Sequence, residues 1–379
     1  MIIKNASVYT PEGKFEKKDI VINGEYFAEK AKADEEVLNA GECYAIPGLT
    51  DIHFHGCGGY DFCDGEVEAI HKIASFQAKC GVTGMIPATM TLDEESLLKI
   101  CRAASNFHKA QDMGKYQQDA TFLGIYLEGP FISKEKKGAQ NGRYIRKPDK
   151  KLYDAICQES GRLIKLVTIA PEEEGAMEFI RDIKKEVIVS IGHTKADYNT
   201  ALAAFENGAG HVTHLYNAME PFSHRQPGVT GAAADAGASV ELICDGIHVH
   251  PAMVRSTIKM MGEDRVIFVS DSMRAAGLPE GTYSLGKQEV TVIGNRATLA
   301  DGTIAGSVKS LMDCMKIAVK EMRIPLETAV RCAAVNPAKK AGVYQWCGSI
   351  EPGKTANLVL LDKENLTVRK VFIKGQELF

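Results

Sequence analysis

The stretch YAIPGLTDIHFHGCGG, residues 44–59, joins an apolar run to two histidines two positions apart and a glycine-rich turn. In an extended strand, side chains at positions i and i+2 point to the same face, so His53 and His55 would present their ring nitrogens together. Such a pair can hold a metal ion. On its own, an HxH pair is slightly more typical of a site without metal, in which one histidine is buried and hydrogen-bonded and the other lies at the surface. The choice between a metal site and two unrelated histidines therefore depends on the rest of the chain.

Seven further short apolar runs follow, and their β-branched residues are typical of buried parallel strands. They read GVTGMIPAT, TFLGIYLEG, IKLVTIAPE, VIVSIGHT, GHVTHLYNA, VELICDGIH and VIFVSD. Helical patterns fill most of the gaps, for example residues 66–80 and 93–109, the second opening with the capping-box-like TLDEE. Eight strands that alternate with helices predict an α/β fold, a (β/α)8 barrel of the TIM type, over residues 48–344.

The two ends of the chain show a different pattern. MIIKNASVYT and DIVINGEYF, the latter with an Asn-Gly turn, resemble antiparallel strands, as do TANLVLLD and VRKVFIKGQEL near the other end. We expect these segments to pair in a small β-sandwich domain of residues 1–47 and 345–379. A third hairpin-like segment, residues 281–303, follows the eighth barrel strand and could join the same domain.

The composition excludes several classes of function. The formal net charge of −4 and the pI near 6.2 provide no general attraction to nucleic acid or to an anionic membrane. No apolar run is long enough to span a bilayer, and the first residues lack the pattern of a signal peptide. Ten cysteines without a CxxC pair fit a reducing compartment. We expect a cytoplasmic protein that binds neither nucleic acid nor membranes.

Polar residues end several of the predicted barrel strands, at the end of a TIM barrel that carries the chemistry. They are His53, His55, Glu128, His193, His214 and Asp271. A buried polar residue satisfied by its neighbours explains any one of them, but six at one end of a barrel favour a metal site. Imidazole and carboxylate ligands suit Zn²⁺ or Fe²⁺, and the absence of cysteine favours a catalytic site. His211 falls on the opposite strand face from His214 and is expected to be a packed histidine.

Seven motifs carry a resemblance along nearly the whole chain: LEGPF, KKGAQN, GHT, HVTHLYNAM, RQPGVTGAA, DGIHVHP and GSIEPGKTANLVLLD. In this order they resemble the N-acetylglucosamine-6-phosphate deacetylases of the amidohydrolase superfamily. The resemblance implies a homodimeric enzyme that hydrolyses N-acetylglucosamine 6-phosphate to glucosamine 6-phosphate and acetate in amino-sugar catabolism.

The same resemblance implies roles for the strand-end residues. Glu128, His193 and His214 would hold one essential divalent ion that activates water, and Asp271 would pass a proton from that water to the leaving amine. Some relatives keep the two histidines after the first strand and bind a second ion there. The opening HxH pair therefore marks room for a second metal.

The resemblance also implies contacts to the substrate. Arg225 and His248 would contact the phosphate group, with further hydrogen bonds from Asn217 and the backbone of Ala218. Some relatives have a histidine twelve residues after the glutamate ligand, where it polarises the substrate carbonyl, and this chain has Gln140. The glutamine amide can donate a hydrogen bond to that oxygen, but it cannot become cationic.

Three alternative functions are compatible with the predicted fold. A deacetylase for N-acetylgalactosamine 6-phosphate would share every motif, because the two sugars differ in the orientation of one hydroxyl group. The hydantoinase and dihydroorotase branch needs a carboxylated lysine at the end of strand four, whereas Lys165 lies near the start of that strand. A non-catalytic scaffold with the same fold predicts gaps among the ligands, and the sequence has none.

Overall fold

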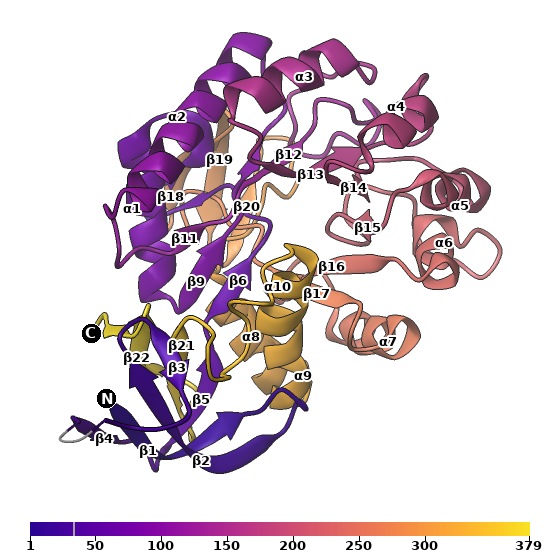
Figure 1. The fold of residues 1–379 in the computed structure, drawn as a ribbon. Coiled ribbons are helices and arrows are strands. Elements are labelled where there is room, and N and C mark those ends of the chain that lie inside the picture. Colours follow the sequence, from indigo (N-terminus) through magenta and orange to yellow (C-terminus); the bar gives the residue numbers. More distant parts are fainter. Residues whose placement is uncertain (33–34) are drawn as a thin grey trace.

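A ring of parallel strands forms the centre of the computed structural model, which describes residues 1–32 and 35–379 (Figure 1). In order, the ring contains β6 (Leu49–Asp51), β9 (Val82–Met85) with β10 (Ala88–Thr89), β11 (Thr121–Phe122) with β12 (Ile125–Glu128), β13 (Ile164–Ile169), β14 (Ile188–Ile191), β15 (His211–Val212), β16 (Ser239–Ile243) and β17 (Val266–Val269). The backbone N–H of Asp271 donates to the carbonyl of His53 at 2.9 Å, which joins the last strand to the first. The predicted (β/α)8 barrel and its eight apolar runs are confirmed.

Helices follow the strands and pack their apolar faces on the ring. They are α1 (Val67–Lys79), α2 (Glu94–Asp112), α3 (Lys150–Glu159), α4 (Ala176–Ile183), α5 (Tyr198–Asn207), α6 (Gly228–Ala236), α7 (Pro251–Met261), α8 (Leu311–Lys320), and the continuous run of α9 (Leu326–Val330), η2 (Arg331–Val335) and α10 (Asn336–Lys340). Asp93 caps α2, since its side chain accepts the N–H of Ser96 at 2.9 Å. Within residues 1–32 and 35–379, no helix combines the length and the apolar composition that crossing a bilayer requires.

The two ends of the chain pair with each other in one sheet. Its strands are β1 (Ile2–Tyr9), β2 (Phe15–Asn23), β3 (Tyr26–Ala28), β4 (Val37–Asn39), β5 (Cys43–Pro47), β21 (Leu358–Asp362), β22 (Val368–Ile373) and β23 (Gln376–Glu377). The order is β23-β22-β21-β5-β1-β2-β3, with β4 beside β1. The expected pairing is present, as one continuous sheet in place of two separate layers, and β5 runs directly into barrel strand β6 at Gly48. The exact division into domains stays a prediction.

The segment after the eighth strand does not join that sheet, which corrects the suggestion that residues 281–303 belong to the terminal domain. β18 (Gly281–Leu285), β19 (Gln288–Ile293) and β20 (Arg296–Thr298) form a separate antiparallel sheet, here named the rim sheet, away from β1 and β2 in Figure 1. Arg274 holds it in place, because its side chain donates to the carbonyl of Ser284 at 3.0 Å and to Asp64 at 2.8 Å. The short hairpin of β7 (Gly56–Cys57) and β8 (Tyr60–Asp61), followed by η1 (Phe62–Asp64), lies on the other side of this contact.

Candidate active site

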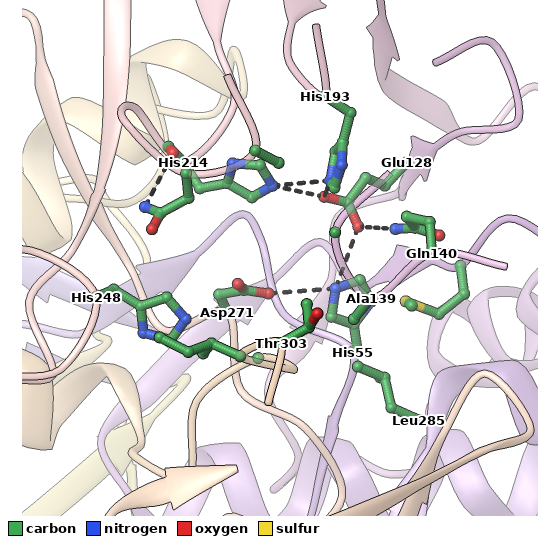
Figure 2. Close-up of a pocket in the computed structure, with 16 residues that line it drawn as sticks. His55, Glu128, Ala139, Gln140, His193, His214, His248, Asp271, Leu285 and Thr303 are labelled. Atoms are coloured by element: carbon green, nitrogen blue, oxygen red, sulfur yellow. Dashed lines mark hydrogen bonds and ion pairs between the residues drawn. The ribbon is translucent and has the colours of Figure 1, made fainter. Parts of the chain in front are cut away.

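Six side chains from the carboxyl ends of barrel strands converge in one buried cluster, most of which is drawn in Figure 2. They form two groups, within each of which the ligand atoms lie within 4.8 Å of one another. Group one is Glu128, His193 and His214, and group two is His53, His55 and Asp271. None of the six is more than 7% exposed. The structure thus brings together every residue that the sequence suggested as a metal ligand or proton carrier.

Hydrogen bonds fix the orientation of three of the four imidazoles. Nδ1 lies within reach of a carboxylate or carbonyl oxygen in each: His53 to Glu241 at 2.8 Å, His55 to the carbonyl of Ala88 at 3.2 Å, and His193 to the carbonyl of Lys136 at 2.9 Å. Because these oxygens only accept, Nδ1 must carry the proton. Each ring therefore directs Nε2 into the cluster, as in imidazoles that ligate metals.

The donor set fits a divalent cation. Nε2 of His193 lies 3.1 Å from Nε2 of His214, and both atoms lie near Oε1 of Glu128, at 3.1 and 3.0 Å. Nε2 of His53 is buried without a hydrogen-bond partner among the described residues, 3.4 Å from Oε1 of Glu128 and 3.9 Å from Asp271. Nitrogen lone pairs and carboxylate oxygens repel at these separations unless positive charge lies between them. Nitrogen and oxygen ligands in this mixture suit a borderline divalent ion.

The pKa shifts of the clustered side chains also indicate that positive charge stabilises this site. Burial alone would raise the pKa of the Glu128 carboxyl, but the surrounding imidazoles, His53 foremost, hold that pKa well below its usual range. Burial opposes protonation of His55, yet the carboxylates of Asp271 and Glu128 raise its pKa to about 10. The hydrogen bond from His55 keeps the pKa of Asp271 below its usual value despite burial. Without a metal ion, protons supply the missing charge, and an incoming ion must displace them.

Backbone conformation helps to aim three of these side chains. His193, His214 and Asp271 have φ angles of 47°, 26° and 45°, in the left-handed region that few residues other than glycine adopt. Each stands just after a barrel strand, where the chain turns sharply. Such conformations persist where the surrounding structure enforces them, and they are common at functional sites.

A cavity of about 240 Å³ opens beside the cluster and carries the expected substrate contacts except one. Its lining includes Gln140, Asn217, Ala218 and His248, together with the apolar side chains of Met90, Ala139, Leu285 and Ile304. The rim sheet therefore supplies part of the wall, as the position of Leu285 in Figure 2 shows.

Gln140 is held on both sides of its amide group. Its Nε2 donates to Oε2 of Glu128 at 2.7 Å (Figure 2), and its Oε1 accepts the backbone N–H of Thr91 at 2.6 Å. Asn217, in contrast, donates from its side-chain Nδ2 to the carbonyls of His214 and Leu215, at 3.1 and 3.2 Å. The first amide thus orients a candidate metal ligand, and the second stabilises the turn after β15.

Comparisons with known proteins agree with this geometry. The chain matches the amidohydrolase family over residues 44–378. The chain belongs to the amidohydrolase family. It is 37% identical over 96% of its length to the N-acetylglucosamine-6-phosphate deacetylase of Bacillus subtilis (strain 168), of which the match covers 90%. It is 35% identical over 87% of its length to the N-acetylgalactosamine-6-phosphate deacetylase of Escherichia coli O157:H7, covering 86% of that protein.

A solved structure of an amidohydrolase has the same fold across the whole chain. A mutant of the N-acetyl-D-glucosamine-6-phosphate deacetylase from Mycobacterium smegmatis, in complex with N-acetyl-D-glucosamine-6-phosphate, superposes with a TM-score of 0.91 at 30% identity. The match covers 100% of this chain and 98% of the other.

Arg225 is the exception among the expected site residues of this amidohydrolase. It is exposed, in the loop between β15 and α6, and it is not among the residues that line the cavity. Phe222, in the same loop, is 41% exposed. Within one chain the structure therefore does not bring Arg225 to the other site residues.

Sequence reasoning missed Glu241, which lies in β16 and contacts His53, His211 and the backbone of His214. The signal was a charged residue inside the apolar run VELICDGIH, because a carboxylate in a strand buried on both faces needs partners. The expectation for His211 is confirmed, since it is fully buried and bonds to Glu241 and Ser239 away from the cavity.

Proposed function

We propose that this amidohydrolase hydrolyses N-acetylglucosamine 6-phosphate to glucosamine 6-phosphate and acetate in amino-sugar catabolism. The observation that carries the proposal is the position of Asp271, which lines one cavity together with His248, His55 of group two and all three members of group one. The names of the Bacillus subtilis and Mycobacterium smegmatis relatives support the choice of substrate.

Glu128, His193 and His214 would hold one essential divalent ion, Zn²⁺ or Fe²⁺, and group two would hold a second. When bound, such an ion supplies a water molecule whose pKa is lowered to about 7 and which can attack at neutral pH. The chain's own residues must then position the substrate and move one proton.

Asp271 is the residue that we assign to proton transfer. Its low pKa keeps the carboxylate ionised at neutral pH, so it can accept a proton as water adds to the acetyl carbon. When the C–N bond breaks, the same carboxyl group returns that proton to the departing nitrogen, which leaves as the amine while the acetyl group leaves as acetate. The remaining hydrogen of the Gln140 amide can donate to the carbonyl oxygen during this step.

Recognition of phosphate would use His248 from the same chain and Arg225 from a second one. His248 lines the cavity, whereas Arg225 does not and is exposed in the same loop as the exposed Phe222. We propose a homodimer in which this loop packs on the partner and Arg225 completes the partner's phosphate site. A guanidinium group contacts two phosphate oxygens at once, which suits it to this role.

The test is acetate release from the purified protein, with N-acetylglucosamine 6-phosphate, its galactosamine counterpart and unphosphorylated N-acetylglucosamine. We expect the first to give the highest kcat/KM and the last almost no turnover. Chelation should abolish activity, and Zn²⁺ or Fe²⁺ should restore it. Full activity in metal-free protein would exclude the proposed chemistry.

A second candidate substrate is N-acetylgalactosamine 6-phosphate, which the 35% identical Escherichia coli relative favours. The same assay separates the two. Both sugars present the same acetamide and phosphate groups, so a difference in kcat/KM would report only the orientation of one hydroxyl group. A higher kcat/KM for the galactosamine compound would replace the proposed substrate while leaving the reaction unchanged.

A further inference from the structure

Glu241 is a carboxylate that contacts a member of each ligand group from behind. It is fully buried in β16 and is not among the residues that line the cavity. Its Oε2 accepts from Nδ1 of His53 at 2.8 Å and from the backbone N–H of His214 at 2.9 Å. Its Oε1 lies 3.0 Å from Nε2 of His211.

Two N–H donors occupy one oxygen of this side chain. Oε2 accepts from Nδ1 of His53 and from the backbone of His214, so it carries no proton. The third neighbour, Nε2 of His211, faces Oε1. The half-buried ammonium group of Lys340, which donates to the carbonyl of Gly210 at 2.9 Å, adds positive charge nearby.

We propose that Glu241 is a positioning residue that sets the affinity of group two for its metal ion. By accepting the Nδ1 proton of His53, it locks that ring in the tautomer whose Nε2 lone pair faces His55 and Asp271. Without this acceptor, the ring can carry its proton on Nε2 and donate to Glu128, 3.4 Å away, which removes a ligand. The inference rests on the proposed function in one respect, since it takes the two groups to bind divalent ions.

The contact to His214 does not predict the same effect on group one. Glu241 accepts from the backbone of His214, while the imidazole of His214 faces Glu128 and His193 through Nε2. A glutamine at position 241 retains a carbonyl oxygen for the N–H groups of His53 and His214. It loses the charge that raises the basicity of His53, and loss of such partners lowers metal affinity by about 10–100-fold.

The experiment is a Zn²⁺ titration of metal-stripped protein in competition with a chromophoric chelator, which resolves two steps of uptake. His53→Asn identifies the step that belongs to group two. Glu241→Gln should weaken that same step by about 10–100-fold and leave the other unchanged. His211→Gln is the matched control, because it changes the opposite partner of the same carboxylate and keeps the bond to His53. We expect both steps of this control to match the wild type.

Unchanged uptake by Glu241→Gln would overturn this inference alone, and equal losses in Glu241→Gln and His211→Gln would do the same by assigning the effect to packing. Wild-type protein that takes up no Zn²⁺ would overturn the proposed function as well. Where Glu241→Gln fails to fold, nitrogen-15 NMR of Zn²⁺-loaded wild-type protein decides. The His53 ring should carry its proton on Nδ1, and an unprotonated Nδ1 would refute the proposed tautomer.

Discussion

Nδ1 of His248 lies 2.7 Å from Oδ2 of Asp245, and the backbone N–H of the same histidine donates to Oδ1 of Asp245 at 2.9 Å. Burial opposes protonation of the ring, but the Asp245 carboxylate outweighs it and raises the pKa of His248 above its usual value. Only the cationic ring can donate from Nδ1 to Asp245 and from Nε2 to a phosphate oxygen at once.

This pair predicts a pH dependence of substrate binding. The cationic form of His248 is present below its raised pKa and is lost as the pH increases through that value. The KM for the phosphorylated sugar should therefore stay low above pH 6.5, the ordinary histidine pKa, and increase at higher pH. Asp245→Asn removes the cause of the shift, so the increase in KM should begin at lower pH. Steady-state kinetics of both proteins across the pH range would show this, and coincident KM profiles would contradict it.

Asp271→Asn should fold, retain the ion of group one and bind substrate, while kcat falls by about 10²–10⁴-fold. Asparagine has nearly the same shape, but its amide cannot accept the proton that leaves the attacking water. Metal content, substrate binding and kcat are measured together. Near-normal turnover would place the base elsewhere, and loss of the group-one ion would make Asp271 chiefly a ligand.

Arg225→Met should raise the KM for the phosphorylated sugar by the equivalent of about 2–5 kcal/mol, because a charged hydrogen-bonding partner of the phosphate is lost. Because Arg225 is exposed outside its own cavity, we expect it to act across a dimer interface. Mixing Arg225→Met chains with Asp271→Asn chains should then restore activity, since one site of each mixed dimer contains Asp271 and Arg225 of the partner subunit. Absence of recovery in verified mixed dimers would place Arg225 in its own site.

Gln140→Leu should lower both stability and kcat. It removes the amide contact to Oε2 of Glu128 and leaves the buried N–H of Thr91 without the Gln140 oxygen, and an unsatisfied buried group typically costs about 1–3 kcal/mol. Gln140→His keeps a donor at this position and should retain more activity than the leucine variant. Thermal unfolding, metal content and acetate release of the two variants provide the comparison. Equal activity of both would show that the amide serves neither Glu128 nor the carbonyl.

Much of the barrel could be predicted because its strands are buried on both faces and therefore read as apolar runs. The run VIFVSD, for example, ends at Asp271, and strand β17 (Val266–Val269) ends just before it. The candidate ligands could be predicted for a related reason, because polar residues at the carboxyl ends of the strands of one barrel meet at the same rim. The resemblance added the assignment of roles to His193 and His214.

Other features depend on contacts that no local pattern encodes. The alternation in residues 281–303 predicts strands, but it does not say which sheet they join, and the contacts of Arg274 place them at the rim. Arg225 lies in the motif RQPGVTGAA, yet only the fold shows that it is exposed and does not line its own cavity. The left-handed conformation of His214 likewise arises from the packing around it.

The pairing of β5 with β21, from Cys43↔Asp362 to Pro47↔Leu358, also constrains how the protein is made. During synthesis, β1, β2 and β5 leave the ribosome long before β21 exists, so this sheet cannot be completed until the barrel between them has been translated. A message truncated after the barrel would yield chains whose β5 is an unprotected edge strand, ready to pair with another chain. Because β21 covers this edge only after the barrel has been synthesised, termination before β21 should produce aggregates rather than a smaller working enzyme.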